Sequence, residues 1–250
     1  MPLLAASAFA RRISAVKTHG ALHDALAEAC DRMGIRYFAL SHHVDFSASP
    51  RAVRIHNYPP GWQDWYDANR LGLSDPIHRA SHRTAQGFLW RNVPQLIPLT
   101  RADRDVLARG REIGLGEGVT IPAHVPGEAL GSCTFVSVAD EALPDDVLPW
   151  AQMIGLFAFE GARRLFRQRR RTPGVRVSDR QRECIALAGR GLRNHEIARE
   201  LGIGEQTVLE HMREARARLG VHSRTELVVR LIADGALCID DVLKPERMAL

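Results

Sequence analysis

Long apolar runs are missing from this 250-residue chain. A helix that crosses a bilayer needs about 18 or more consecutive apolar residues, and no stretch approaches that length. We therefore expect no membrane span. At the N-terminus, Arg11 and Arg12 follow the apolar stretch instead of preceding it, which is the reverse of the order in a secretory signal. The sequence thus predicts a protein that stays in the cytoplasm.

Cysteine is also scarce, and the four that are present lie far apart: Cys30, Cys133, Cys184 and Cys238. No histidine stands near them at metal-ligand spacing, which argues against a zinc site. A disulfide framework in a small secreted domain would need a denser pattern. We expect four reduced, mostly buried thiols.

Positive charge is concentrated in one part of the chain. Residues 160–224 hold 16 arginines, no lysine and 8 acidic residues, a net charge of +8, whereas the whole chain carries +5. The remainder is therefore slightly acidic. A basic C-terminal segment on an acidic body suggests a polyanionic partner for that segment alone. A solvated arginine-rich surface would give the same balance, so charge alone leaves both interpretations open.

The segment from Arg167 to Arg176 divides the chain, because it lacks apolar periodicity and contains Pro173-Gly174. We predict a domain over 1–166, a linker over 167–177 and a second domain over 178–250. In the first domain the patterns predict a mixture of helices and strands. The expected helices are Leu22–Met33, Gly61–Asn69 and Thr100–Ile113, and the expected strands are Tyr37–Phe46, Ala52–Tyr58, Gly118–Val125 and Leu130–Ala139. Adjacent strand pairs, the last joined by a hairpin, indicate an α+β domain with an antiparallel sheet sandwiched by helices.

A long helix is expected over Asp145–Arg170, and it carries two apolar rows. One row should pack on the sheet: Val147, Trp150, Ile154, Phe157, Gly161 and Leu165. The other row lies off this stripe: Leu148, Leu156, Phe159 and Phe166. A second apolar face needs a cover, and we predict that a second copy of the chain supplies it in a homodimer. The alternative is a helix buried on two sides within one chain.

The C-terminal domain reads as four short helices placed by their caps. Capping boxes open the first and last helices at Ser178–Gln181 and Ser223–Glu226. Between them, Asn194–Leu201 and Gln206–Leu219 are joined by the turn Gly202-Ile203-Gly204. Two short helices joined by a glycine turn in a compact helical unit form the helix-turn-helix pattern. The last helix should stop at Asp234-Gly235.

This segment resembles the LuxR-type DNA-binding domain. The resemblance rests on Arg182-Glu183, Gly191, Asn194-His-Glu-Ile-Ala198, Leu201-Gly-Ile203, Thr207-Val208, His211, Arg218-Leu-Gly-Val221 and Arg224. It implies a transcription regulator that inserts the third helix into the major groove of double-stranded DNA. Two positions depart from the family pattern: Gly204 stands where serine usually caps the recognition helix, and Leu209 where a basic residue is common.

A recognition helix presents base-edge donors near its N-terminus and phosphate-binding cations around it. We predict base contacts from Gln206 and Arg213. The predicted phosphate contacts are Arg193, Arg216, Arg218 and Arg224. Any single arginine could instead be a solvated surface charge.

The first domain resembles the acyl-homoserine-lactone-binding domain. The resemblance rests on Tyr58-Pro-x-x-Trp62-x-x-x-Tyr66, Asp75-Pro76, Trp90 and Gly118-Val-Thr-Ile-Pro122, with matching intervals. It implies that Trp62 donates to the lactone carbonyl and that Asp75 accepts from the amide N–H. Tyr58, helped by Thr134, would donate to the amide carbonyl, while Tyr66 and Trp90 wall the pocket. Taken singly, the aromatic residues would be ordinary core residues, and only their combined spacing points to an autoinducer as the small-molecule ligand.

Three alternative functions share some of these features. A LuxR-type regulator that answers a non-lactone molecule would show the same polar anchors. A phosphorelay receiver needs an acidic pocket and a suitably placed lysine, but the only N-terminal lysine is Lys17. An enzyme or metal site would have to use His42, His43, His56, His78, His82 or His124. Only His78 and His82 have helical ligand spacing, and we expect this pair to face solvent. The sequence therefore predicts no enzyme, no metal and no cofactor.

Overall fold

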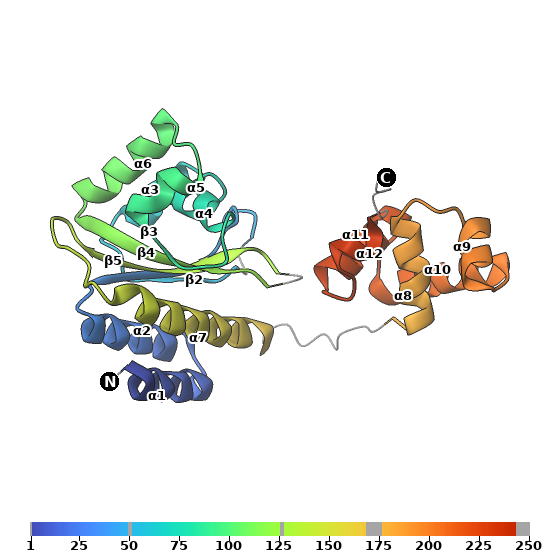
Figure 1. Cartoon of the computed structure of the whole chain (residues 1–250), viewed down its shortest axis with the longest axis horizontal. Coiled ribbons are helices and arrows are strands. Elements are labelled where there is room, and N and C mark those ends of the chain that lie inside the picture. Colours follow the sequence, from blue (N-terminus) through green and yellow to red (C-terminus); the bar gives the residue numbers. More distant parts are fainter. Residues whose placement is uncertain (1, 50–51, 126–127, 169–176, 244–250) are drawn as a thin grey trace, which may run out of the picture. The chain divides into compact units, whose positions relative to one another are not determined.

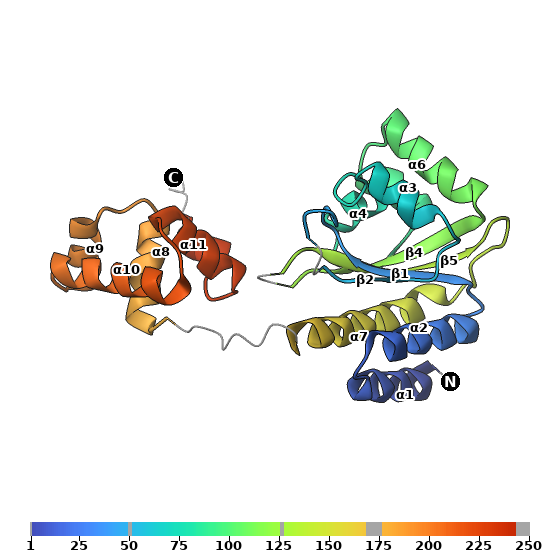
Figure 2. The ribbon, with the colours of Figure 1, turned by 180° about the vertical axis from the view of Figure 1, so that it is seen from behind.

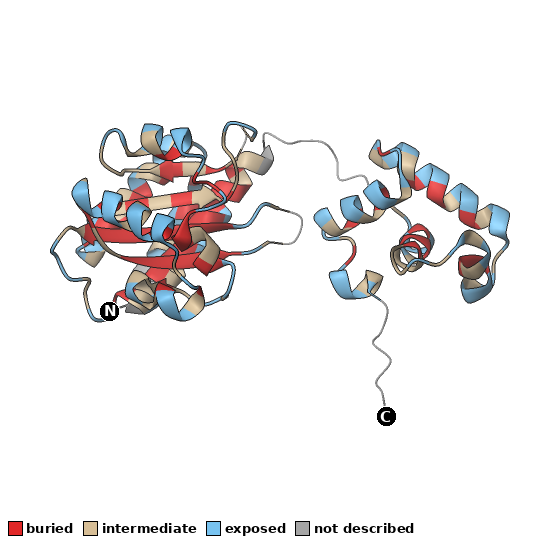
Figure 3. Ribbon diagram, turned by 90° about the horizontal axis from the view of Figure 1, so that it is seen from above, coloured by how far each residue is buried: buried red, intermediate tan, exposed pale blue. Residues whose placement is uncertain are grey.

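The computed structural model describes residues 2–49, 52–125, 128–168 and 177–243. The chain folds as two compact units, one holding the elements from α1 to α7 and the other those from α8 to α12. Figure 1 shows the elements of both units. Each unit has its own apolar core, and Figure 3 shows the buried residues in each. The predicted linker, 167–177, lies mostly outside the described residues, since α7 ends at Gln168 and α8 begins at Asp179.

The first unit is built on a five-stranded antiparallel sheet with the order β2-β1-β5-β4-β3. Its strands are β1 (Tyr37–His42), β2 (Arg54–His56), β3 (Phe88–Leu89), β4 (Leu115–Ala123) and β5 (Gly131–Val138). The first two are shorter than expected. The central strands β4 and β5 are buried on both faces, because helices cover the sheet on both sides.

The two helical layers differ in character (Figures 1 and 2). One face carries three long helices: α1 (Pro2–Ala15), α2 (His19–Met33) and α7 (Val147–Gln168). The other face carries shorter pieces: α3 (Trp62–Ala68), α4 (Pro76–Ser81), the 3-10 turn η1 (Trp90–Asn92), α5 (Val93–Leu96) and α6 (Arg101–Glu112). The predicted sandwich of a sheet between helices is thus confirmed. The sequence patterns did not predict α1, α4, β3, η1 or α5.

The packing of α7 differs in one detail from the core face that the sequence predicted for this helix. Phe157, placed on the core stripe, is 42% exposed, whereas Phe159, placed off it, is only 2% exposed. Phe159 is buried because its ring lies over Gly131, where a Cβ would sit 2.5 Å from the ring. The helix packs on the sheet and also on α1 and α2, so it is covered on two sides within the chain. Leu156 and Phe157 remain exposed.

The second unit contains the four expected helices and one more. They are α8 (Asp179–Gly189), α9 (Asn194–Leu201), α10 (Glu205–Leu219), α11 (Arg224–Ala233) and the short α12 (Ile239–Val242). Ser178 and Gln181 form the predicted capping box. The second predicted box is incomplete: Ser223 accepts from the N–H of Glu226, but the Glu226 carboxylate bonds the N–H of His222 instead.

Three cysteines are buried as expected, and Cys238 is exposed. Within the described residues, no helix combines the length and apolar character needed to cross a bilayer.

Candidate ligand cavity and nucleic-acid interface

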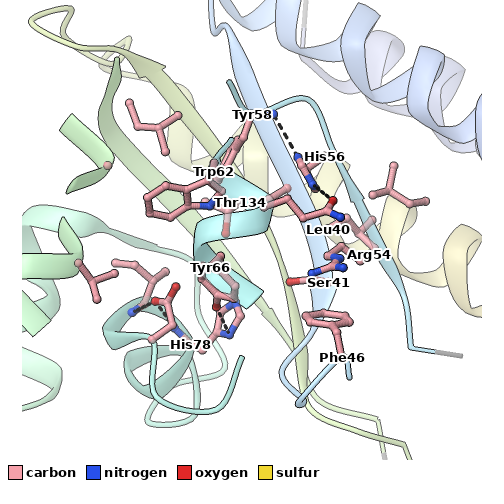
Figure 4. Close-up of a pocket in the computed structure, with 18 of the residues that line it drawn as sticks. Leu40, Ser41, Phe46, Arg54, His56, Tyr58, Trp62, Tyr66, His78 and Thr134 are labelled. Carbon is pink, nitrogen blue, oxygen red and sulfur yellow. Dashed lines mark hydrogen bonds between the residues drawn. The ribbon is translucent and has the colours of Figure 1, made fainter. Parts of the chain in front are cut away.

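A cavity lies between the sheet and the layer of short helices. All six side chains predicted to bind the ligand line it: Tyr58, Trp62, Tyr66, Asp75, Trp90 and Thr134. They come from segments that are far apart in the sequence, and Figure 4 shows Tyr58, Trp62, Tyr66 and Thr134 turned toward one space. Folding therefore brings together residues that the sequence spreads over nearly 80 positions.

Helix α3 supplies two of these side chains. Trp62 and Tyr66 are four residues apart, so they lie on one face of the helix, and their ring centroids are 5.9 Å apart. The helix begins after Gly61, whose φ of 82° is a left-handed conformation that glycine adopts without strain. This turn aims the first residue of the helix, Trp62, into the cavity.

Asp75 has two roles in the structure. The residue is only 7% exposed, and its Oδ1 accepts from the N–H groups of Ile77 (2.7 Å) and His78 (3.4 Å). It therefore caps α4, and Pro76 at the first helical position fits that start. The same carboxylate faces the cavity beside the Tyr66 hydroxyl. Burial, reinforced by Asp75, raises the pKa of Tyr66, so this phenol keeps its proton.

Two further donors, the Trp62 indole N–H and the Tyr58 hydroxyl, face the cavity. Neither of them has a hydrogen-bond acceptor among the residues that the structure describes. Burial, with a smaller effect of Asp75, raises the pKa of Tyr58. Tyr58 is consequently a neutral donor at physiological pH. The cavity thus offers unpaired donors beside one buried carboxylate.

Trp90 differs from Trp62, because its N–H is already used. Its Nε1 donates to Thr120 Oγ1 at 3.0 Å. The indole lies on Gly118, where a Cβ would come within 2.4 Å of the ring. Gly118 is therefore needed to make room for the Trp90 side chain.

Sequence reasoning missed several polar residues that line the cavity. Ser41 on β1 and Arg54 and His56 on β2 lie on the sheet, whereas Gln63 lies on α3. His56 Nε2 lies 2.8 Å from Gln63 Oε1, and the Arg54 guanidinium stacks 4.1 Å from the Phe46 ring centroid. The signal was the period-two alternation in β2, an edge strand of the sheet, which puts Arg54 and His56 on the same face.

The expectation that His78 faces solvent was wrong. Its ring is half-buried, lines the cavity and stacks on His43 with centroids 3.7 Å apart. His82 is exposed, but its Nε2 lies 2.8 Å from His43 Nδ1. Burial, followed by the charges of neighbouring histidines, lowers the pKa of His43. This arrangement could not be predicted from the sequence, because β2 and α3 separate His43 from His78 and His82 along the chain. Among the described residues, no group of three ligating side chains is arranged for a metal ion.

In the second unit, α10 has a core face and an outward face. Val208, Met212 and Ala215 are buried, whereas Gln206 and Arg213 are exposed on the other side. Leu209, 43% exposed, lies between them on that face. Gly204 is the N-cap residue and provides no side-chain cap, as the departure at this position implied.

The four arginines predicted to bind phosphate have different environments. Arg193 and Arg218 are exposed, and Arg216 is half-buried. Arg224 donates to the carbonyl of Leu192 and, at 3.3 Å, to Asn194 Oδ1. It thereby ties the start of α11 to the turn before α9. A phosphate would have to share the Arg224 guanidinium with these two acceptors.

Comparison with protein families identifies both units. Residues 18–162 match the family described as "Autoinducer binding domain". Residues 176–231 match "Bacterial regulatory proteins, luxR family". The chain is also 28% identical over 225 residues to the transcriptional activator protein AhyR of Aeromonas hydrophila, with 86% of each chain covered.

Solved structures share the fold. SdiA of Escherichia coli matches with a TM-score of 0.71 at 20% identity, covering 96% of this chain and 98% of that one. SdiA in complex with octanoyl-rac-glycerol gives a TM-score of 0.69 at 20% identity, with 91% and 93% covered. CepR2 of Burkholderia cenocepacia, described as an N-acylhomoserine lactone-dependent LuxR-family transcription factor, gives 0.52 at 17% identity, with 68% and 97% covered.

Proposed function

The chain belongs to the LuxR family of autoinducer-binding, DNA-binding transcription regulators, and we propose that its ligand is an N-acyl-homoserine lactone held in the cavity beneath α3. The observation that carries this proposal is chemical complementarity. Tyr58, Trp62 and Thr134 present donors to the cavity, and Asp75 presents a buried acceptor. An acyl-homoserine lactone has two carbonyl acceptors near one amide N–H, on an otherwise apolar molecule.

The polar groups can be assigned one by one. Trp62 donates to the ring carbonyl, Tyr58 and Thr134 donate to the amide carbonyl, and Asp75 accepts from the amide N–H in a charge-assisted bond. Tyr66 and Trp90 form walls, because Trp90 has its N–H committed to Thr120. A few fixed polar groups within an apolar and aromatic wall are what small-molecule sites provide.

The direct test identifies the retained ligand. The full chain would be expressed with a mixture of lactones of different acyl length, purified, extracted and analysed by mass spectrometry. We expect one lactone at close to one equivalent per chain, and its loss from Asp75→Asn prepared in the same way. Recovery of only a non-lactone acyl compound, with Asp75→Asn retaining it equally, would contradict the proposal.

A second candidate ligand is a non-lactone acyl compound. It is favoured by the polar residues Ser41, Arg54 and His56 on the sheet side, which a plain alkyl tail would leave unused. The related SdiA has been solved with octanoyl-rac-glycerol, which lacks an amide. The extraction experiment separates the two candidates, because only the lactone carries the N–H that Asp75 accepts.

The regulator acts as a homodimer on a two-fold DNA site, with half-sites about one helical turn apart. Support comes from Leu156 and Phe157, which remain exposed on α7 after the chain's own packing. Phe157→Ser should therefore lower the molar mass measured by light scattering with ligand and DNA present. Asp105→Asn, an exposed polar change on α6 on the other side of the sheet, should not. A monomeric wild type at micromolar concentration would refute the dimer.

Ligand binding should also stabilise the fold. A ligand that binds only the folded form adds RT ln(1 + [L]/Kd), about 2.7 kcal/mol at a hundredfold excess over Kd. Thermal unfolding with and without the extracted lactone measures this stabilisation. No shift in the unfolding midpoint at that excess would mean that the compound does not occupy the native cavity.

A further inference from the structure

Three residues of the central hairpin stand next to each other on the cavity side of the sheet. Thr120 on β4 is the register partner of Thr134 on β5, and Gly118, two residues before Thr120, pairs with Val136. Side chains two apart on a strand, and those of directly paired residues, share one face. The hydroxyls of Thr120 and Thr134 are accordingly 2.9 Å apart.

Trp90 fixes the direction of the first hydrogen bond in this group. Its indole rests on Gly118 and brings Nε1 to 3.0 Å from Thr120 Oγ1. An indole N–H can only donate. Thr120 must therefore accept from Trp90.

The Thr120 hydroxyl then has to donate to a different acceptor. Thr120 is fully buried, and among the described residues the only acceptor assigned near its hydroxyl is Thr134 Oγ1. If Thr134 donated instead, the Thr120 proton would be a buried donor without an acceptor, which costs about 1–3 kcal/mol. Thr120 therefore donates to Thr134, and the three groups form a chain with a single direction.

The last proton in the chain faces the cavity. Thr134 is buried, lines the cavity and has no other hydrogen-bond partner in the described part of the chain (Figure 4). Because Thr134 already accepts from Thr120, its own proton is left to point at the ligand.

We propose that Thr120 is a positioning residue. It accepts a hydrogen bond from the Trp90 N–H and donates one to Thr134, so that the Thr134 hydroxyl can only donate to the ligand. The cavity then selects molecules that present an acceptor at this point, such as a carbonyl oxygen, and rejects molecules that present only a donor. The inference rests on the proposed function only in placing a ligand in this cavity.

A double-mutant cycle on ligand affinity tests this chain of hydrogen bonds from Trp90 through Thr120 to Thr134, which we call the relay. Thr120→Val keeps the shape and removes the hydroxyl, and Thr134→Val removes the group that contacts the ligand. In the wild-type background, Thr120→Val should weaken lactone binding about threefold to tenfold, the net worth of one neutral hydrogen bond. In the Thr134→Val background it should change the Kd less than twofold, because the relay has lost its end point. Thr120→Ser should restore affinity to within twofold of wild type.

Ser132→Ala is a matched control. Ser132 lies on the same strand and face as Thr134, and its buried hydroxyl bonds His43 Nε2 at 2.9 Å without lining the cavity. It should leave the Kd within twofold in both backgrounds. An equal loss from Thr120→Val in both backgrounds, or no loss in either, would overturn the relay and leave Thr120 as a packing residue.

A ligand-free readout separates this inference from the proposed function. The chain has four tryptophans, and Trp90→Phe assigns the Trp90 indole signal in an NMR spectrum of the apo protein. That N–H should be protected from solvent exchange in wild type and Thr120→Ser, and should lose protection and shift in Thr120→Val. If no lactone binds wild type, the proposed function fails while the indole signal still tests the Trp90–Thr120 bond on which the relay depends. An unchanged signal in Thr120→Val would overturn it.

Discussion

Replacing Asp75 by asparagine isolates the ligand contact from the structural role of this residue. Asparagine is as good an N-cap as aspartate, so its oxygen can keep the bonds that Asp75 Oδ1 makes to Ile77 and His78. The amide NH₂ must then take the place of the second carboxylate oxygen. There it would oppose the ligand N–H, so that two donors meet. We expect the apo fold to persist and lactone binding to fail.

The magnitude follows from the bond that is lost. Hydrogen bonds to charged groups contribute about 1.5–3 kcal/mol, so the Kd should rise about 10- to 150-fold in Asp75→Asn. Asp75→Ala also removes the cap of α4, which costs about 0.5–2 kcal/mol of stability. For a chain of this size, the apo melting temperature of Asp75→Ala should fall about 2–4 °C for each kcal/mol.

Titration calorimetry and thermal unfolding of the apo protein give the two readouts separately. Asp64→Asn, an exposed change on α3, is the control for altered charge and should bind like wild type. If Asp75→Asn bound lactone within twofold of wild type with an unchanged apo melting temperature, the carboxylate would not be the acceptor for the ligand N–H. The assignment of the cavity's polar groups would then have to be abandoned.

Three more measurements probe other parts of the chain. Arg213→Ala should weaken binding to the specific DNA site by about 1–3 kcal/mol at fixed salt and leave random DNA unaffected, whereas an equal loss on both would make Arg213 a phosphate contact. Gly204→Ser should raise the free energy of unfolding of the second unit by about 0.5 kcal/mol in urea, because φ is −71° and the new Cβ would have 3.6 Å to its nearest neighbour. A loss of stability there would show that this turn requires glycine. The folded-state pKa of His43 is lowered by burial and by the facing His78, His82, His124 and His42, so the unfolded chain takes up the proton first as pH falls. Stability should be constant above about pH 6.5 and decline below it, by at most about 1.4 kcal/mol per pH unit for this group, and His43→Asn should flatten the profile. A profile identical to that of wild type would exclude His43 as its source.

The parts of the fold that local chemistry determines were predictable from the sequence. Capping is decided within four residues, so Ser178 placed the start of α8 and the Gly202 turn placed the end of α9. The spacing from Trp62 to Tyr66 placed both on one helical face, which the cavity confirms as a shared lining.

What sequence reasoning missed depends on distant contacts. Phe159 is buried because Gly131, on the strand that faces it, leaves space for its ring. Helical periodicity alone cannot predict that space. His78 stacks on His43, which reaches it from the end of β1. The two-residue strand β3 has no period of its own, and only its pairing with β4 defines it.

The double use of Asp75 restricts how ligand preference could be redesigned or could drift. Any side chain at this position must both begin a helix and meet the ligand, so only residues that cap as aspartate does are open to trial. The sheet side is under no such double demand, since Ser41 and His56 cap no helix. A library meant to change which molecule the sensor answers should therefore leave the α4 side fixed and vary β1 and β2.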